Sequence, residues 1–428
     1  MTMRVLYSLV IAFSTPFVLL YFCLRGLRDR SWLRRWGERF GFVPANIKAG
    51  GILLHAASVG EFNASRPLIK ALQDSYPDLP LTISTLTPSG AAQVRDIAGD
   101  KLAHVFIPID LPGAAARFLK RLAPRLIIVM ETEIWPNLYL QAARLDIPLM
   151  IANARISRRS AHRYQKMPNF TRQIMHSVSW FGAQTADDED RFISCGADPR
   201  RAERTGNLKF DLDVSADLTA KAQVLRAGWN PHRPVLVAGS THQSDEAIIV
   251  PAFCELLAHL PEALLILVPR HPERFNRATQ FAKAAGLQVA LHSEAESCSE
   301  MTQCFVIDSM GLLMTYYACA DVAFVGGSMG DAGGHNALEA AALGKPVMLG
   351  RNTENASEIA ALLLGSGAAL RVNNQQEFLQ TAETLLTNSG LRTRMGQAGK
   401  ALVEQNTGAL KLTLNAIERQ LFKPEQPD

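Results

Sequence analysis

Short apolar runs alternate with amphipathic stretches along most of this chain, and the alternation occurs in two separate series. Apolar runs of this kind are typical of strands buried on both faces, and helical stretches between them favour parallel pairing. The first series therefore predicts a doubly wound parallel sheet with helices on both faces. Its expected strands are Ile52–His55, Leu81–Ser84, His104–Ile107, Leu126–Met130, Leu149–Ala152 and Trp180–Ala183, with helices such as Ala64–Asp74 and Gly113–Leu122 between them.

A polar helical stretch and the turn-rich segment GWNPHRP interrupt the alternation near residues 208–234, as is typical of a domain boundary. A second series follows, so we expect two Rossmann-like, doubly wound α/β domains. The two halves also echo each other, because ILLHAASVGEF and VLVAGSTHQSDE both run from a strand into a small-residue loop and then an acid. The strands expected in the second half are Val235–Ala238, Leu264–Val268, Val289–Leu291, Phe305–Ile307, Val322–Val325 and Val347–Leu349.

The apolar run Val5–Leu24 is long enough to cross a bilayer, and six arginines follow it. Apolar length followed by positive charge predicts a membrane-anchor helix, with the rest of the chain on the cytoplasmic side. The alternative is a cleaved signal peptide, but the run is long and no small-x-small cleavage site follows it. The arginines are Arg25, Arg28, Arg30, Arg34, Arg35 and Arg39.

Trp32, Trp36 and Phe40 fall four residues apart among these arginines, so they would share one stripe of a helix. Indoles and guanidiniums are both favoured at the level of lipid headgroups, which suits a segment lying on a membrane surface. An ordinary helix packed on the first domain is the alternative.

Charge and cysteine content restrict the function further. A formal net charge of +4 over 428 residues is too small to argue for a nucleic-acid partner. The six cysteines form no C-x-x-C pair and have no zinc spacing with histidine, so reduced core thiols and a cytoplasmic globular part are expected.

The stretch Asp321–Gly350 has the pattern of a nucleotide site without a P-loop or a Walker lysine. A buried strand leads into a loop of small residues, and the helix expected next carries His335–Glu339 in its first turn. Ligands of open α/β sheets collect beyond the carboxyl ends of strands, and a helix N-terminus offers N–H groups to an anion. Gly333 and Gly334 would let the backbone approach a phosphate, and Glu339 could accept hydrogen bonds from sugar hydroxyls.

Six motifs occur in this chain in the order in which one protein family carries them. They are HAASVGE (His55–Glu61), METEIWPN (Met130–Asn137), NARIS (Asn153–Ser157), NLKFD (Asn207–Asp211), PRHPER (Pro269–Arg274) and GGHNALE (Gly333–Glu339). By these motifs the chain closely resembles the 3-deoxy-D-manno-octulosonic acid (Kdo) transferases of Gram-negative lipopolysaccharide synthesis. The resemblance covers nearly the whole chain and includes an N-terminal membrane anchor.

The resemblance implies an inverting glycosyltransferase of GT-B fold, with two Rossmann-like domains facing a cleft. Kdo would pass from CMP-Kdo to lipid IVA, a lipid A precursor, without a metal or another cofactor. The implied partners are CMP-Kdo, lipid IVA and the lipids of the inner membrane, on its cytoplasmic side. The expected segments are an anchor at 1–27, an acceptor-binding domain at 28–210, a linker at 211–232, a nucleotide-sugar-binding domain at 233–405, and at 406–428 a helix that crosses back to the first domain.

Three residues are the catalytic candidates. Glu61 follows the first expected strand, where a carboxylate could take the proton of an attacking alcohol or merely satisfy a helix dipole. The resemblance assigns it as the base. It also implies that Glu131 supports the transition state and that Lys209, otherwise a solvent-facing lysine, stabilises the departing phosphate. Glu131 and Glu133 have no Asp or His beside them to complete a metal pair.

The donor nucleotide is expected on the second domain. Arg270 offers a planar fork for phosphate oxygens, whereas the adjacent His271 would more often be structural. The resemblance assigns CMP binding to Pro269, Arg270, Met310, Gly311, Leu312, Asn336, Ala337, Leu338 and Glu339. Leu312 stands where relatives often carry an acid, so only backbone contacts could survive there. Further phosphate contacts are expected from Ser240, Thr241, Gly333 and Gly334.

A basic run follows the strand Leu149–Ala152, and such a run is usually a solvated face. Because the implied acceptor is a phosphorylated lipid at a membrane, we expect Arg155, Arg158 and Arg159 to contact it.

Two alternatives remain open. The fold alone would also suit a UDP-sugar transferase or an epimerase, which competition between CMP and UDP would discriminate. A catalytically dead membrane scaffold is the other, although Glu61, Glu131 and Glu339 are all present.

Overall fold

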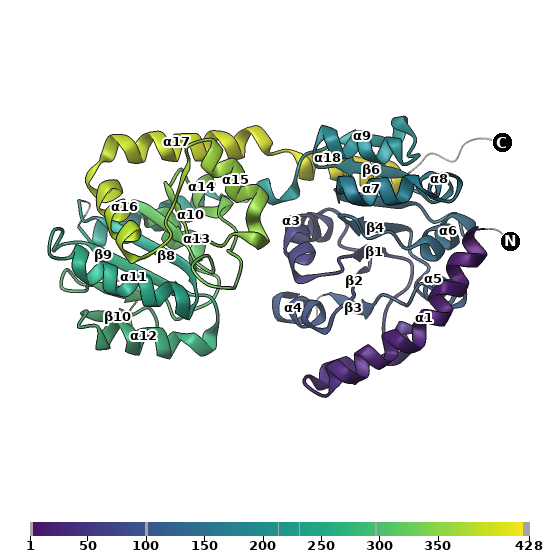
Figure 1. The fold of residues 1–428 in the computed structure, drawn as a ribbon, viewed down its shortest axis with the longest axis horizontal. Coiled ribbons are helices and arrows are strands. Elements are labelled where there is room, and N and C mark those ends of the chain that lie inside the picture. Colours follow the sequence, from purple (N-terminus) through teal and green to yellow (C-terminus); the bar gives the residue numbers. More distant parts are fainter. Residues whose placement is uncertain (1–2, 99–101, 213, 231, 296–297, 423–428) are drawn as a thin grey trace. The chain divides into compact units, whose positions relative to one another are not determined.

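Two compact units make up the computed structural model, which describes residues 3–98, 102–212, 214–230, 232–295 and 298–422. Unit 1 comprises Met1–Asp211 and Thr407–Asp428, and unit 2 comprises Leu212–Asn406. Each unit contains a seven-stranded parallel sheet with helices on both faces (Figure 1). The α/β fold class predicted from the apolar alternation is confirmed.

The sheet of unit 1 has the strand order β3-β2-β1-β4-β5-β6-β7. The order reverses between β1 and β4, so the loops that leave these two strands diverge. Such a switch point is where ligands bind in open α/β sheets. The strands are β1 (Ile52–His55), β2 (Leu81–Thr85), β3 (Ala103–Phe106), β4 (Leu126–Met130), β5 (Leu149–Ala154), β6 (Trp180–Ala183) and β7 (Ala202–Arg204).

Both faces of this sheet are buried, which explains why its strands are continuous apolar runs. In β4, Ile127 and Val129 belong to one core cluster, whereas Ile128 and Met130 belong to the cluster on the opposite face. The helical segments of unit 1 are α1 (Met3–Gly26), η1 (Arg30–Leu33), α2 (Trp36–Arg39), α3 (Val59–Ser75), α4 (Pro88–Ala98), α5 (Pro112–Leu122), α6 (Pro136–Arg144), α7 (Arg158–Gln165), α8 (Pro168–His176), α9 (Ala186–Ser194), η3 (Pro199–Arg201), η4 (Leu208–Phe210) and α18 (Ala409–Leu421).

The last helix, α18, packs on unit 1 although the chain has passed through unit 2 before reaching it. Ala416 and Ile417 of α18 lie in the same core cluster as Leu54 of β1. The carboxylate of Asp211 accepts hydrogen bonds from the N–H groups of Gly408, at 2.7 Å, and Leu410, at 2.9 Å. Asp211 therefore takes the place of a side-chain cap at the start of α18.

Unit 2 repeats this architecture with the strand order β10-β11-β9-β8-β12-β13-β14, and its switch point lies between β8 and β12. The strands are β8 (Val235–Thr241), β9 (Leu264–Pro269), β10 (Val289–Leu291), β11 (Cys304–Val306), β12 (Val322–Val325), β13 (Val347–Leu349) and β14 (Ala369–Arg371). The helical segments are α10 (Ala216–Gly228), α11 (Gln243–Leu256), η5 (Pro272–Arg274), α12 (Phe275–Ala284), α13 (Leu313–Cys319), α14 (Leu338–Ala342), η6 (Glu354–Ala356), α15 (Ser357–Gly365), α16 (Gln375–Thr387) and α17 (Ser389–Asn406).

Two local predictions are wrong. The stripe of Trp32, Trp36 and Phe40 does not lie on one helix, because Arg35 has a left-handed backbone (φ 59°) that separates η1 from α2. The helix after β12 does not begin near His335, since α14 starts only at Leu338 and has five residues. It is too short to supply a helix dipole for an anion.

Candidate active site

Glu61 lies at the switch point of unit 1, in the first turn of α3 and directly after β1. The hydroxyl of Ser58 accepts a hydrogen bond from the N–H of Glu61 at 3.3 Å and donates to its carboxylate at 3.1 Å. The other carboxylate oxygen accepts the N–H of Ala57 at 2.8 Å. These three hydrogen bonds fix the Glu61 carboxylate at the carboxyl edge of the sheet.

Burial is the main reason that the pKa of Glu61 is raised to about 7, although the hydrogen bond from Ala57 opposes the rise. The charges of Glu133 and Glu131 raise the pKa of Glu61 further. The pKa of Glu133 is also raised, again mainly by burial. A carboxylate that titrates near neutrality is suited to accept a proton during catalysis.

Glu131 lies across the switch point from Glu61, because it follows β4. Its backbone is left-handed (φ 57°), and its N–H donates to the carbonyl of Ala152 at 3.0 Å. The Glu131 carboxylate is 4.0 Å from Nζ of Lys209 and 4.0 Å from Nε of Arg155. The structure therefore brings the three catalytic candidates of the sequence to one edge of one sheet.

A buried amide network holds the segment that carries Lys209. The side-chain oxygen of Asn153 accepts the N–H of Leu208 at 3.0 Å, and its carbonyl accepts the side-chain amide of Gln184 at 2.9 Å. Gln184 in turn accepts the side-chain amide of Asn207 at 3.0 Å, and Asn207 caps the N–H of Lys209 at 3.0 Å. The NARIS and NLKFD motifs thus cooperate to position one lysine.

The switch point of unit 2 is flanked by histidines and Arg270. His242 follows β8 and His335 follows β12; their Nε2 atoms are 2.9 Å apart and their rings stack with centroids 5.1 Å apart. The ring of His271 meets His242 edge-on at 5.6 Å, and the N–H of Arg270 donates to the carbonyl of Thr241 at 3.0 Å. Burial, and then the charge of Arg270, lowers the pKa of His335 to about 4. His335 is therefore neutral near pH 7, while Arg270 carries the positive charge.

The two loops that resemble each other in sequence also have similar positions in the two units, but their acidic residues have different roles. Asp245 occupies the first turn of α11 as Glu61 does in α3, yet Asp245 is fully buried. Its carboxylate accepts the N–H groups of His242, Gly327 and Met329 at 2.8, 2.7 and 3.0 Å. Asp245 therefore organises the loops of the second switch point, whereas Glu61 keeps a titratable carboxylate.

The loop after β12 is shaped by glycines and internal hydrogen bonds. Gly333 and Gly334 both have a φ of 78°, a backbone conformation that side chains disfavour. The N–H groups of Gly334 and His335 donate to the carbonyls of Gly327 and Gly326 at 2.8 and 3.2 Å. These N–H groups thus stabilise the loop that leads to α14.

The remaining predicted donor residues lie at the same edge of the second sheet. Pro269 ends β9, the Met310–Leu312 turn follows β11, and Ala337 is the N-cap of α14. Met310 is 57% exposed and Gly311 has a φ of 86°. The hydroxyl of Thr241 is buried and donates to Glu246 at 3.1 Å, so its bond stabilises the loop. Asn336, Leu338, Glu339 and Ser240 complete the set, with Asn336 accepting the N–H of Leu338 at 3.1 Å.

The basic acceptor candidates are all exposed. Arg158 pairs with Asp187 at 3.8 Å and has a side chain that is 89% exposed, and Arg159 is the next residue of α7. Arg155 is half-exposed and is the member that reaches Glu131.

Sequence reasoning missed Gln184 and His242. His242 could have been found by pairing the two echoed loops, because both loops must border a switch point in a doubly wound sheet. Gln184 carried no such signal, since a single glutamine after a strand is unremarkable in sequence.

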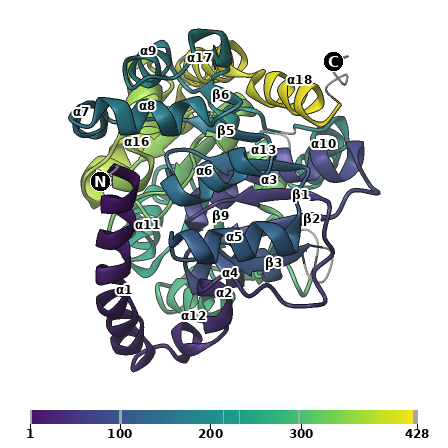
Figure 2. The ribbon, with the colours of Figure 1, turned by 90° about the vertical axis from the view of Figure 1, so that its right-hand side faces the viewer.

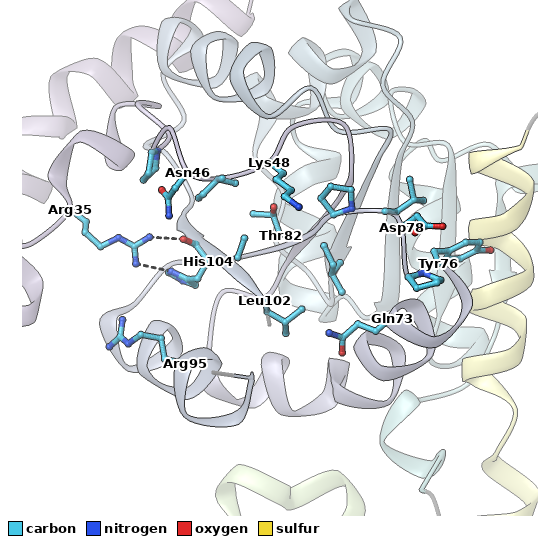
Figure 3. A pocket seen from close by; sticks show the side chains of 17 residues that line it. Arg35, Asn46, Lys48, Gln73, Tyr76, Asp78, Thr82, Arg95, Leu102 and His104 are labelled. Atoms are coloured by element: carbon cyan, nitrogen blue, oxygen red, sulfur yellow. Dashed lines mark hydrogen bonds between the residues drawn. The ribbon is translucent and has the colours of Figure 1, made fainter. Parts of the chain in front are cut away.

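A cavity of about 850 Å³ opens at the opposite, amino-terminal edge of the first sheet (Figure 3). It is lined by Lys48, Arg95 and His104, and by Arg35, whose guanidinium contacts the ring and the carbonyl of His104 at 2.9 and 2.6 Å. None of the catalytic candidates lines this cavity. Within the part of the chain that the structure describes, no group of three or more His, Cys, Asp and Glu side chains is arranged to hold a metal ion.

Comparisons with known proteins agree with this architecture. A sequence profile described as 3-Deoxy-D-manno-octulosonic-acid transferase (kdotransferase) matches residues 34–212, and one described as Glycosyl transferases group 1 matches residues 284–402. The 3-deoxy-D-manno-octulosonic acid transferase of Haemophilus influenzae is 39% identical over 421 residues, which cover 98% of this chain and 99% of that protein.

Solved structures share the fold at low identity. A glycosyltransferase from Rickettsia africae superposes with a TM-score of 0.53 at 13% identity, covering 88% of this chain and 100% of that one. The UDP-GlcNAc 2-epimerase of Neisseria meningitidis, bound to UDP-GlcNAc, has a TM-score of 0.53 at 16% identity, covering 86% and 100%.

Two doubly wound α/β units of this kind are the GT-B fold, and the two matching profiles show that this chain is a glycosyltransferase of that class. The likeness to the Haemophilus protein over nearly the full length of both chains is more specific. The chain belongs to the 3-deoxy-D-manno-octulosonic acid transferases, which act in lipopolysaccharide biosynthesis.

Proposed function

We propose that this Kdo transferase moves Kdo from CMP-Kdo to the glucosamine disaccharide of lipid IVA in one inverting displacement, with Glu61 as the base. The observation that carries the proposal is the placement of the Glu61 carboxylate, which Ala57 and Ser58 hold at the switch point of unit 1, where burial raises its pKa to about 7. An ordinary carboxylate at the start of a helix would be ionised far below neutrality and would be a weak proton acceptor.

In the displacement, one proton is transferred, one bond forms and one bond breaks. An acceptor hydroxyl gives its proton to the Glu61 carboxylate while its oxygen bonds to the anomeric carbon of Kdo. The bond from that carbon to the phosphate oxygen breaks, and its electron pair leaves with CMP. A single displacement at this carbon inverts its configuration.

Cationic side chains are assigned to the charge that leaves with CMP. Arg270 follows β9 at the second switch point and would bind donor phosphate oxygens with its planar fork. Lys209 would stabilise the developing negative charge, and Glu131, 4.0 Å away, holds its ammonium in place. The five-residue α14 is too short to provide this charge, so the assignment rests on the side chains.

The acceptor assignment follows from charge and location. Arg155, Arg158 and Arg159 form an exposed basic surface, and Arg155 joins that surface to Glu131 at the carboxyl edge of the first sheet. A phosphorylated disaccharide fits such a surface. The helix α1 is long and strongly apolar, and the basic residues that follow it would be attracted to the anionic lipids of the cytoplasmic leaflet, which supports a location at the cytoplasmic side of the inner membrane.

Mass spectrometry of the product formed from CMP-Kdo and tetraacylated lipid A precursor tests the reaction. Kdo added to the disaccharide is the expected result. Thermal shift with CMP and with UDP tests the donor, and a larger shift with UDP would overturn the CMP assignment. Full activity after treatment with EDTA is expected for the metal-independent mechanism; activity lost to EDTA and restored by a divalent ion would contradict it.

A further inference from the structure

The amino-terminal turns of α1 are bound to unit 1 by polar contacts. The hydroxyl of Tyr7 donates to the carboxylate of Asp110 at 2.9 Å. The hydroxyl of Ser8 and Nε of Arg4 both donate to the side-chain oxygen of Asn137, at 3.2 and 3.4 Å. Asp110 and Asn137 are themselves buried, and Asp110 also accepts the N–H of Asn137 at 2.9 Å. This end of α1 is therefore docked on a rigid part of the globular unit.

The carboxyl-terminal end of α1 is bound to the same unit. Phe22 is buried, its ring lies 5.3 Å from that of Trp32, and the guanidinium of Arg39 lies 5.2 Å above it. Arg39 donates to the carbonyl of Leu86 at 2.8 Å. Tyr7 and Phe22 are fifteen residues apart, about 22 Å along a helix axis. Figure 2 shows α1 running from beside α6 and α8 toward α2.

The two sides of α1 differ in chemistry. The side that packs on the rest of unit 1 carries the polar residues Arg4, Tyr7, Ser8 and Thr15 as well as the apolar Ile11, Val18 and Phe22. The exposed side is an apolar stripe with alternating three- and four-residue spacing that continues to Leu27, just beyond the helix; Leu27 is 83% and Phe13 76% exposed. The stripe consists of Met3, Leu6, Val10, Phe13, Phe17, Leu20, Leu24 and Leu27.

A membrane-spanning α1 is incompatible with these contacts. Residues 4–8 of a spanning helix would lie about 30 Å from residues 26–27, beyond the hydrocarbon core. Asp110 and Asn137 belong to the folded sheet unit, in the loop after β3 and at the start of α6. They could reach Tyr7 and Ser8 only if the helix lies beside the unit.

We assign one binding partner to the exposed stripe, an anionic lipid bilayer. Arg25 lies in the last turn of α1 and Arg28, Arg30 and Arg34 follow the stripe, and all four are exposed. The guanidinium of Arg25 lies 5.4 Å from the ring of Trp32 and 5.7 Å from that of Tyr21. Apolar side chains flanked by arginine and tryptophan match the acyl boundary and the negatively charged headgroups of a bilayer surface.

We propose that α1 lies in the plane of the membrane interface, docked on Asp110 and Asn137, with its apolar stripe in the lipid, and that it does not span the bilayer. This goes beyond the proposed function, which requires only attachment. Asp110, Leu86 and Asn137 follow the carboxyl ends of β3, β2 and β4. The amino-terminal turns of α1 are therefore docked at the carboxyl edge of the first sheet, the edge to which Glu61 belongs, and the helix would hold the lipid surface on this side of unit 1.

The test uses a fluorescent probe on the full chain. Cys23 and Cys254 are replaced by serine, because the other four cysteines are buried, and an NBD group is attached to Met3→Cys or to Leu24→Cys. The proteins are added to preformed vesicles of phosphatidylethanolamine and phosphatidylglycerol, and dithionite, which does not cross the bilayer, is added outside. We expect both probes to be bleached at similar rates. Bleaching of the Leu24 probe with protection of the Met3 probe would overturn the proposal.

A second measurement examines the docking itself. In the same serine background, Ser8→Cys with Asn137→Cys is expected to close a disulfide under mild oxidation in vesicles. The matched pair Phe13→Cys with Asn137→Cys is expected to stay open, since Phe13 lies on the lipid stripe. Closure in detergent but not in vesicles would count against in-plane docking. Kdo transfer by the same vesicles is scored separately, so a failure of the transfer reaction cannot be mistaken for a failure of the helix placement.

Discussion

The side-chain oxygen of Asn153 accepts a hydrogen bond from the backbone N–H of Leu208 at 3.0 Å, across 55 residues of sequence. Leu208 begins the short η4 segment, whose next residue is Lys209. Because Asn153 has a left-handed backbone (φ 54°), its side chain turns out of β5 toward η4. One buried amide thereby determines where the lysine beside Glu131 can lie.

A glycine at position 153 can adopt the left-handed backbone conformation of Asn153, but it removes the hydrogen bond from the N–H of Leu208. We expect a loss of stability of about 1–3 kcal/mol, because a buried N–H is left without its partner. Kdo transfer should fall by about a hundredfold if Lys209 moves by about 1 Å. Denaturant unfolding and initial rates check the two effects.

The positioning role of Asn153 is separated from a general loss of stability by a double variant. Adding Lys209→Met to Asn153→Gly should reduce transfer little further, because residues acting as a unit are not additive. Asn374→Gly is the matched control, since it removes an N-cap bond of α16 at 2.9 Å in unit 2 and should leave transfer unchanged. Full additivity of Asn153 and Lys209 would refute the positioning role.

Glu61→Gln keeps the size of the side chain and its capping acceptor but removes the base. We expect transfer to fall by about 10²–10⁴-fold while CMP binding persists. Glu377→Gln is the matched control, because Glu377 makes the same capping contact to the N–H four residues earlier, at 2.9 Å. Loss of CMP binding in a folded Glu61→Gln protein would remove the assigned role.

The pH dependence of transfer should report the same carboxylate. With a pKa of about 7, Glu61 is protonated below neutrality, so kcat/KM should fall about tenfold per pH unit there and level off above it. Initial rates at subsaturating acceptor measure this profile. A flat profile between about pH 5 and about pH 8 would exclude Glu61 as the titrating base.

The free energy of unfolding should decrease with rising pH over the range in which the transfer rate increases. The pKa of Glu61 is raised on folding from its ordinary 4.5, so its protonated form contributes stability that is complete below about 4.5 and is lost as pH rises through about 7. Glu61→Gln carries no such charge. Its Tm relative to the unmodified protein should therefore rise between about pH 5 and about pH 8. A constant Tm difference would show that Glu61 is not buried enough to titrate near 7.

Arg270→Lys keeps the charge but loses the planar fork. We expect the Kd for CMP to rise about tenfold, which corresponds to about 1.4 kcal/mol. Arg277→Lys, on the exposed side of α12, is the control and should bind CMP normally. Equal effects of the two substitutions in calorimetric titrations would argue against a phosphate contact by Arg270.

The sequence predicted the buried strands because an interior strand such as Leu126–Met130 can only be apolar. It missed β7 and β14, whose residues AER and ALR are short, partly exposed edge strands without an apolar pattern. The late start of α14 was equally invisible, because it depends on His335 donating to Gly326 across the loop.

The sequence allowed the residues of the candidate site to be predicted, but it did not indicate how their pKa values are shifted. Motifs placed Glu61 and Glu131 after two strands, but only the strand order makes these strands neighbours. The raised pKa of Glu61 depends on burial and on Glu133, which no spacing rule connects to it. The break at Arg35 likewise depends on a tertiary partner, since its guanidinium contacts the ring of His104 at 2.9 Å and donates to the carbonyl of His104 at 2.6 Å.

The placement of α1 along the end of the first sheet has a consequence for substrate choice. A helix that lies in the plane of the membrane interface and is docked on the first unit would hold Glu61 at a constant height above the acyl chains. An acceptor hydroxyl would then be selected by the distance that its sugar projects from the bilayer. The membrane surface would thus contribute to the choice of acceptor.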